Sequence, residues 1–130
     1  MRAGVLRVDP ALSRGAPPGG DMVIVGDNLA ALGALMPGHA GRVGMVLIDP
    51  PYNTGRRDWL YDDSASHPAA RYWLEGVLGT QRAGSLSRQD RWLCLMYPRL
   101  LQLRRLMAEN GVIACCIDDR EYPRLRLLME

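Results

Sequence analysis

The sequence predicts an open α/β sheet of the doubly wound kind, of which three strands can be recognised in 130 residues. Short apolar runs rich in β-branched residues occupy 22–25, 43–48 and 112–117, and such runs are typical of buried parallel strands. Segments with helical periodicity separate them, as in βαβ units. Three strands are few for a sheet of this kind, so we expect a partial sheet that belongs to a larger domain.

Composition places the chain among ordinary globular proteins. It is 48% hydrophobic and 23% charged, and its net charge is +2. No apolar run reaches the roughly 18 to 20 residues that a membrane span needs, and the N-terminus lacks the apolar core of a secretory signal. We therefore expect a cytoplasmic protein without a membrane partner. Residues 1–21, rich in Gly, Pro, Arg and Ala, predict a flexible leader, and residues 22–130 predict the ordered domain.

The first ordered elements are predicted as strand, helix and strand. The run "MVIV" at 22–25 supplies the first strand, and "NLAALGALM" then places its apolar residues at helical spacing. Asp27 or Asn28 can cap this helix, and Pro37 with the following glycine is expected to stop it. The strand at 43–48 would then lie parallel to the first, with a right-handed crossover.

The second half predicts a long loop followed by helix, strand and helix. Residues 53–90 show no clean period and indicate a long polar loop. Residues 91–109 show amphipathic helical spacing, with Asp90 as a cap and Pro98 as a point of kinking or breakage. The strand at 112–117 follows, and after it a last helix begins.

The cysteines do not indicate a metal site. Cys94, Cys115 and Cys116 form no C-x-x-C pair, and no histidine cluster accompanies them. Cys115 and Cys116 are adjacent in a predicted strand, so their side chains should point to opposite faces. We expect reduced, buried thiols and no bound metal.

The stretch "LIDPPYNTG" carries the clearest chemical signal. Asp49, Pro50, Pro51 and Tyr52 follow a buried strand at its carboxyl end, where open α/β sheets bind ligands. The prolines stiffen the backbone and remove N–H groups, so the turn is rich in hydrogen-bond acceptors. The alternative interpretation is a simple turn after a strand, but the position within a βαβ unit favours a site.

A planar group with an exocyclic amine fits this turn. Asp49 can accept one amine hydrogen and the Pro50 carbonyl the other, while the Tyr52 ring lies against the base. Stacking of a base on an aromatic ring is worth about 1–3 kcal/mol, and a hydrogen bond to a charged acceptor roughly 1.5–3 kcal/mol. Two acceptors would also free the nitrogen lone pair for direct methyl transfer, in which positioning supplies much of the rate. This chemistry requires neither a metal nor a covalent enzyme intermediate.

The motifs "GDNLAAL" and "VLIDPPYNTG", with the segment from Asp90 to the end, resemble the amino-methylating DNA methyltransferases. The resemblance is greatest to the modification subunits of type III restriction–modification systems and their β-group relatives. It implies a Rossmann-like sheet in which residues 22–130 form the N-terminal part of a methyltransferase catalytic domain. It also implies methylation of adenine N6 in double-stranded DNA with S-adenosylmethionine as donor. Asp49, Pro50, Pro51 and Tyr52 match the catalytic motif residue by residue.

The resemblance implies further roles. Asp27 falls where such folds place a group near the adenosine of the donor, although it can equally cap the next helix. Asn53, Arg56 and Arg57 are candidate contacts to nucleic acid, although the two arginines can equally lie on a solvated face. A homodimer and a restriction subunit are candidate partners. The family's Phe-x-Gly-x-Gly donor loop is absent from the sequence. We therefore expect an incomplete fragment that does not methylate DNA alone.

Two other functions stay open on the sequence. One is a methyltransferase that acts on RNA or on a protein amide, although aspartate rather than asparagine at position 49 argues against the amide. The other, from a different class, is a non-catalytic nucleic-acid-binding remnant that holds a base but no methyl donor.

Overall fold

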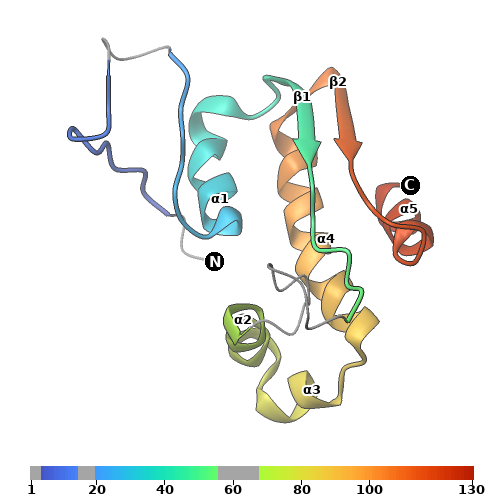
Figure 1. Cartoon of the computed structure of the whole chain (residues 1–130). Coiled ribbons are helices and arrows are strands. Elements are labelled where there is room, and N and C mark those ends of the chain that lie inside the picture. Colours follow the sequence, from blue (N-terminus) through green and yellow to red (C-terminus); the bar gives the residue numbers. More distant parts are fainter. Residues whose placement is uncertain (1–3, 15–19, 56–67) are drawn as a thin grey trace.

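The computed structural model describes residues 4–14, 20–55 and 68–130. Two parallel strands lie beside one another and are backed by helices, with the longest helix running directly behind the strands (Figure 1). In chain order the elements are α1 (Asn28–His39), β1 (Val43–Ile48), α2 (Pro68–Leu78), α3 (Thr80–Ser85), α4 (Arg88–Leu106), β2 (Met107–Cys115) and α5 (Tyr122–Met129).

The sheet is built by the parallel pairing of β1 and β2. Val46 pairs with Ile113 and Ile48 with Cys115, so both strands end at the same edge. The pairing is irregular near the start of β1, where Gly111 passes close to the partner strand. A Cβ atom at Gly111 would lie 2.9 Å from the Val43 carbonyl oxygen, so only glycine fits this approach without a shift.

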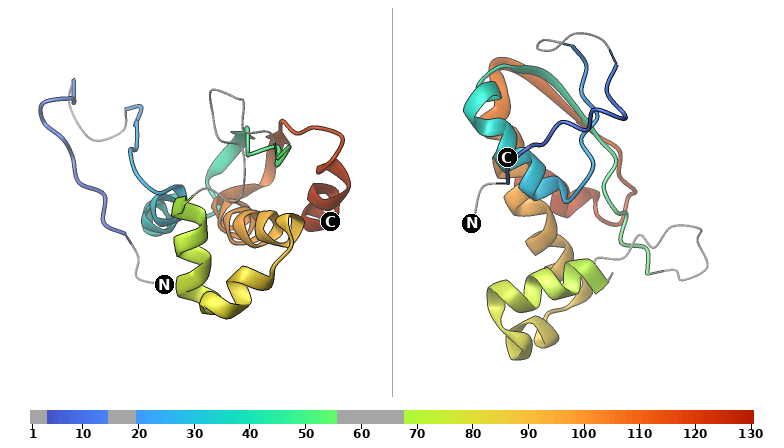
Figure 2. Two further views of the ribbon diagram at one scale, coloured as in Figure 1. Left: turned by 60° about the horizontal axis from the view of Figure 1, so that its bottom comes forward. Right: turned by 90° about the vertical axis from the view of Figure 1, so that its left-hand side faces the viewer.

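Helix α4 supplies most of the core. Its apolar stripe packs against Val46 of β1 and Leu125 of α5, and the buried members on α4 are Trp92, Met96, Leu100 and Leu103. Figure 2 (left) shows α1, α4 and α5 in one row on the same side of the two strands. The opposite face of the sheet is bare in the described residues, where Met45, Leu47 and Val112 are 60–68% exposed.

Helix α1 is held to α4 through its N-terminus. Asp27 is the N-cap, and its carboxylate accepts a hydrogen bond from the Ala30 N–H at 2.9 Å, as predicted. Arg99 of α4 donates to the side chain of Asn28 at 2.8 Å and lies 3.7 Å from the Asp27 carboxylate. The helix continues through Pro37 to His39, so the predicted stop at Pro37 was wrong by one turn or less.

The predicted strand at 22–25 does not form. The segment is extended but unpaired, and Val23 and Val25 are 94% and 90% exposed. A strand needs a neighbour for its backbone hydrogen bonds, and among the described residues β1 pairs only with β2. Within the described part of the chain there are therefore two strands where three were predicted, and the parallel connection from β1 to β2 contains α2, α3 and α4.

The second half also differs from the prediction in its boundaries. The predicted loop at 53–90 contains α2 and α3, although residues 56–67 lie outside the described part of the chain. Helix α4 begins earlier than predicted, because Ser87 and Asp90 form a capping box. It runs without a break through Pro98, and β2 begins at Met107, in a stretch that was predicted to be helical. Within the described residues, no helix is both long and apolar enough to cross a membrane.

Candidate active site

The turn after β1 leaves the carboxyl edge of the sheet and runs along the N-terminal half of α4 (green segment in Figure 1). Its first residue, Asp49, is exposed, whereas Pro50, Pro51 and Tyr52 are half-buried. Asn53 is buried and has a φ of 55°, in the left-handed region that asparagine tolerates better than most residues. The predicted motif is therefore accessible at the sheet edge, with its acid outermost.

The acid and the phenol of the motif lie together. Hydrogen bonding to the Asp49 carboxylate is the main reason that the pKa of Tyr52 is raised above its ordinary value, and desolvation and the Asp49 charge add to it. A phenol that donates to a carboxylate stays neutral and keeps its ring near that acid. The turn thus presents a carboxylate and an aromatic side chain near one another.

The inner side of the turn is attached to α4 by a hydrogen bond. The indole N–H of Trp92 donates to the Pro51 carbonyl at 2.7 Å, and Trp92 has no exposed surface. Among the described residues the Pro50 carbonyl has no such partner. Of the two prolyl carbonyls, that of Pro51 is thus hydrogen-bonded to α4, and that of Pro50 has no partner within the described part of the chain.

A second attachment joins the turn to α5. The side-chain amide of Asn53 donates to the Glu121 carboxylate at 2.6 Å, and both residues are only 1% exposed. The other oxygen of Glu121 lies 3.1 Å from Arg124. The expectation that Asn53 contacts nucleic acid is therefore not supported, because its side chain is enclosed by the protein. Arg56 and Arg57, the other predicted nucleic-acid contacts, lie outside the described residues.

The end of the turn is also closely fitted. Gly55 has a φ of 75°, and a Cβ atom there would overlap the guanidinium of Arg88. Arg120 donates to the Thr54 carbonyl at 3.4 Å. The positive φ favours glycine at position 55. The Arg88 guanidinium lies at the end of a flexible side chain, so it could move aside for a small substituent.

The end of β2 forms the neighbouring edge of the site. The Cys116 N–H donates to the Ile48 carbonyl at 2.9 Å, which places the two cysteines beside the turn. Cys116 is exposed, whereas Cys94 and Cys115 are half-buried, and all three are free. The prediction of buried thiols was therefore wrong for Cys116. Burial raises the pKa of both Cys94 and Cys115.

The Asp118 carboxylate accepts from the N–H groups of Arg120 and Glu121 and stabilises the turn before α5.

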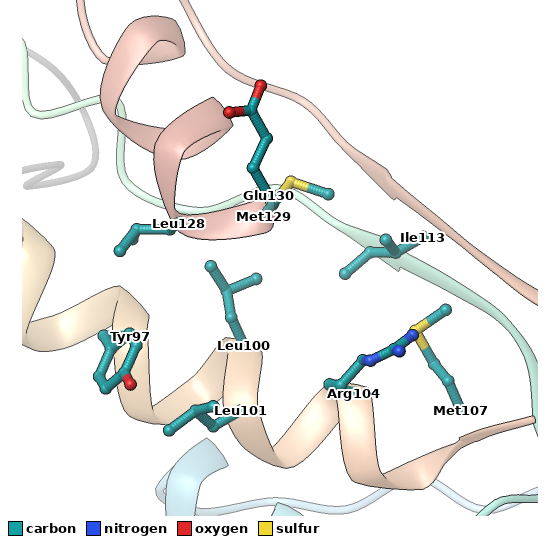
Figure 3. Close-up of a pocket in the computed structure, with 9 residues that line it drawn as sticks. All are labelled: Tyr97, Leu100, Leu101, Arg104, Met107, Ile113, Leu128, Met129 and Glu130. Carbon is teal, nitrogen blue, oxygen red and sulfur yellow. The ribbon is translucent and has the colours of Figure 1, made fainter.

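The predicted donor contact and the described cavity lie apart from the Asp49 edge. Asp27, the predicted contact, uses one carboxylate oxygen to cap α1 and has the other near Arg99. A cavity of about 400 Å³ lies between α4, α5 and β2, with Leu100, Ile113 and Leu128 directed into it (Figure 3). Met107, at the amino end of β2, lines this cavity. The cavity therefore extends toward the amino edge of the sheet, away from the carboxyl edge where Asp49 lies.

The residues that hold the turn were not predicted from the sequence. Trp92 was recognised only as part of the apolar stripe of α4, and Glu121 was not singled out. The available signal was weak, and consisted only of the need of a buried tryptophan for a partner to its N–H. Nothing in the sequence identified Pro51 as that partner.

The fold and the turn define the class of protein. The sequence model of one family, described as DNA methylase, matches residues 43–130, which hold both strands and the Asp49–Tyr52 turn. The chain belongs to this DNA methylase family.

Individual relatives agree with the family. The chain is 38% identical over 116 residues to the Mod subunit of the type III restriction–modification enzyme StyLTI from Salmonella typhimurium, and 39% over 119 residues to that of EcoPI from Escherichia phage P1. Each alignment covers 85% of this chain and 18% of the relative. The type II methyltransferase M.KpnI from Klebsiella pneumoniae is 29% identical over 108 residues, which is 83% of this chain and 22% of that protein. The predicted resemblance to type III modification subunits is thus confirmed, and the chain spans less than a quarter of the length of these relatives.

Proposed function

We propose that this chain supplies the target-amine site of a DNA adenine N6-methyltransferase. The observation that carries the proposal is the Asp49–Tyr52 pair, an exposed carboxylate beside a phenol at the carboxyl edge of the sheet, in a member of the DNA methylase family. We also infer that β1 and β2 belong to a doubly wound, Rossmann-like sheet, in which helices cover both faces. Helices from the rest of such a domain would cover the exposed face that carries Leu47 and Val112.

The proposed role of the turn is to hold the N6 amine of adenine between two hydrogen-bond acceptors. An adenine turned out of the duplex donates one N6 hydrogen to the Asp49 carboxylate and the other to the Pro50 carbonyl, while the Tyr52 ring lies against the base. Two acceptors draw the amine toward tetrahedral geometry and make its lone pair available for methylation. S-adenosylmethionine is proposed as the donor from the family alone, and Asp27 as one contact to it.

The proposal also concerns partners. Double-stranded DNA is the proposed substrate, and the Mod relatives are named as subunits of restriction–modification enzymes, which supports a restriction subunit as protein partner. A homodimer stays a prediction. The proposed reaction transfers a methyl group from a soluble metabolite to DNA, so we propose that the protein acts in the cytoplasm.

The test is a segment exchange. The aligned 116 residues of the StyLTI Mod subunit are replaced by the matching residues of this chain, and transfer of labelled methyl groups from S-adenosylmethionine to DNA is measured. We expect N6-methyladenine as the product, and its loss in the Asp49→Ala chimera. Glu109→Ala, which removes an exposed carboxylate near the amino end of β2, serves as control and should stay active.

Three results would contradict the proposal. Normal transfer by the Asp49→Ala chimera would remove the carboxylate from the reaction. Methylation of RNA in preference to DNA would favour the alternative substrate. A chimera that binds adenine oligonucleotides but transfers no methyl group would favour the non-catalytic remnant.

A further inference from the structure

The turn carries polar contacts on its inner side that the proposed chemistry does not use. Trp92 donates to the Pro51 carbonyl, and Glu121 accepts from the side chain of Asn53. We propose that Trp92 and Glu121 are positioning residues, which fix the turn so that Asp49 and the Pro50 carbonyl face a bound amine. This inference rests on the proposed function of the turn.

Trp92 connects the turn to the core. Its ring is fully buried in the cluster that contains Val46 and Leu100. Its Nε1–H donates a hydrogen bond to the Pro51 carbonyl oxygen, with 2.7 Å between Nε1 and the oxygen. A buried indole N–H needs an acceptor, and here that acceptor is a backbone atom of the functional motif. Because the ring is rigid and packed, the position of the Pro51 carbonyl follows the position of α4 against β1. The contact also occupies one of the two lone pairs of the Pro51 carbonyl.

Glu121 fixes the turn from the other side. A carboxylate that is only 1% exposed is unfavourable unless it is paired, and Glu121 is paired with Asn53 at 2.6 Å and with Arg124 at 3.1 Å. Buried ion pairs are a poor source of stability compared with apolar packing. What this pair does provide is a fixed position for Asn53, whose backbone adopts a left-handed φ of 55° directly after Tyr52.

The two contacts act on the two ends of one short segment. Pro51 is held by α4 and Asn53 by α5, so the intervening Tyr52 is confined between two fixed points. Tyr52 is also the residue whose pKa is raised by the neighbouring Asp49 carboxylate. Loss of either contact would leave Asp49 and Tyr52 in the sequence but release their relative geometry.

The experiment measures discrimination between two probes by the full chain. One probe is a short pyrimidine oligonucleotide with a single unpaired adenine, and the other is identical except that unsubstituted purine, which lacks the N6 amine, replaces adenine. Fluorescence anisotropy gives the affinity for each. We expect the native chain to prefer adenine by at least about tenfold, the effect of one hydrogen bond to a charged acceptor.

Variants separate positioning from stability. Trp92→Phe keeps a packed ring but removes the N–H, and Glu121→Leu keeps the volume but removes the acceptor; both should reduce the preference for adenine toward equality. Glu121→Gln keeps an oxygen that can accept from Asn53, so this variant should retain the preference for adenine. Arg91→Met is the matched control, because it removes a similar donor on α4 whose acceptor, the Leu86 carbonyl, lies outside the turn. A purely structural role would lower stability without changing the ratio of the two affinities.

A second readout does not require nucleic acid. The ring resonances of Tyr52, assigned with Tyr52→Phe, are followed through an alkaline titration by nuclear magnetic resonance. In the native chain Tyr52 should titrate above an ordinary tyrosine, and in the folded Trp92→Phe and Glu121→Leu variants it should return toward the ordinary value. If Trp92→Phe does not fold, Glu121→Leu carries the test.

The outcomes distinguish the two proposals. If Asp49→Ala retains the adenine preference, or the native chain shows none, the proposed function of the turn fails, and the Tyr52 titration alone decides on positioning. If Asp49→Ala loses the preference while folded Trp92→Phe and Glu121→Leu both keep it, the proposed function stands and the positioning roles are overturned. Unchanged titration of Tyr52 in both variants would overturn them as well.

Discussion

Replacement of Asp27 by alanine tests whether this residue caps a helix or serves a methyl donor. One Asp27 oxygen accepts from the Ala30 N–H at 2.9 Å, and the other lies 3.7 Å from Arg99. Asp27→Ala removes both contacts. The first N–H groups of a helix have no partner within the helix, so α1 would lose its only side-chain cap among the described residues.

The magnitude follows from these two contacts. Loss of an N-cap to alanine costs about 1 kcal/mol. The Asp27 side chain is 64% exposed, so the ion pair with Arg99 is screened by solvent and adds at most about 0.5 kcal/mol. Asp27→Ala should therefore lower the free energy of unfolding by about 1.5 kcal/mol, or roughly 6 °C in Tm for a chain of this size. Asp27→Asn keeps an oxygen at the cap and should cost no more than about 0.5 kcal/mol.

The assay is urea unfolding followed by circular dichroism, with calorimetric titration of S-adenosylmethionine on the same proteins. A capping role predicts that asparagine restores most of the stability and does not alter donor binding. Equal losses for alanine and asparagine would show that the cap is not the source of the stability. If Asp27→Asn were stable but had lost donor affinity that the native chain possesses, the carboxylate would have the donor role that the sequence suggested.

Three further predictions use simple assays. Gly111→Ala should destabilise the chain by roughly 1–3 kcal/mol in urea unfolding because of its backbone contacts, whereas Gly33→Ala, in open space within α1, should stabilise it by about 0.5–1 kcal/mol; the reverse order would contradict the packing. Because the pKa of Tyr52 is raised, its contribution to stability is complete below about pH 10 and disappears as the pH rises through the folded-state value. Tyr52→Phe should accordingly flatten the alkaline decline, and identical slopes would refute this. Iodoacetamide should label exposed Cys116 before Cys115, whose pKa is raised by burial; peptide mass spectrometry that found Cys115 labelled first would be inconsistent with the structure.

The fold could be predicted where the signal is local. The periodicity of α1 and α4, the Asp27 cap and the apolar run of β1 all depend on neighbours within a few residues, and the structure has each of them. The segment 22–25 has equally good strand composition, yet it is unpaired. Composition reports that a segment can form a strand, but pairing depends on a partner that lies elsewhere in the chain.

The position of the candidate site could be predicted from the sequence, but the hydrogen bonds that hold it in place could not. The motif and its place after a buried strand located Asp49–Tyr52 at the sheet edge. The contacts that hold the turn join residues 41 and 68 positions apart in the sequence. Such separations are set by how α4 and α5 pack, which one sequence does not reveal. For the same reason Asn53 was assigned to nucleic acid, although in the fold its amide faces Glu121.

The way in which the turn is held has a consequence for the whole domain. Loops that bear functional groups are usually more mobile than the elements they connect, but this one is fixed through the same tryptophan that packs against Val46. A substitution that shifts α4 against β1 should therefore move the Pro51 carbonyl, and with it the Asp49–Tyr52 pair. A substitution on the bare face of the sheet, such as at Leu47, changes no residue that touches Trp92. Substitutions on the core side of β1 should accordingly disturb the site more than substitutions on the bare side, whatever their distance along the chain from Asp49.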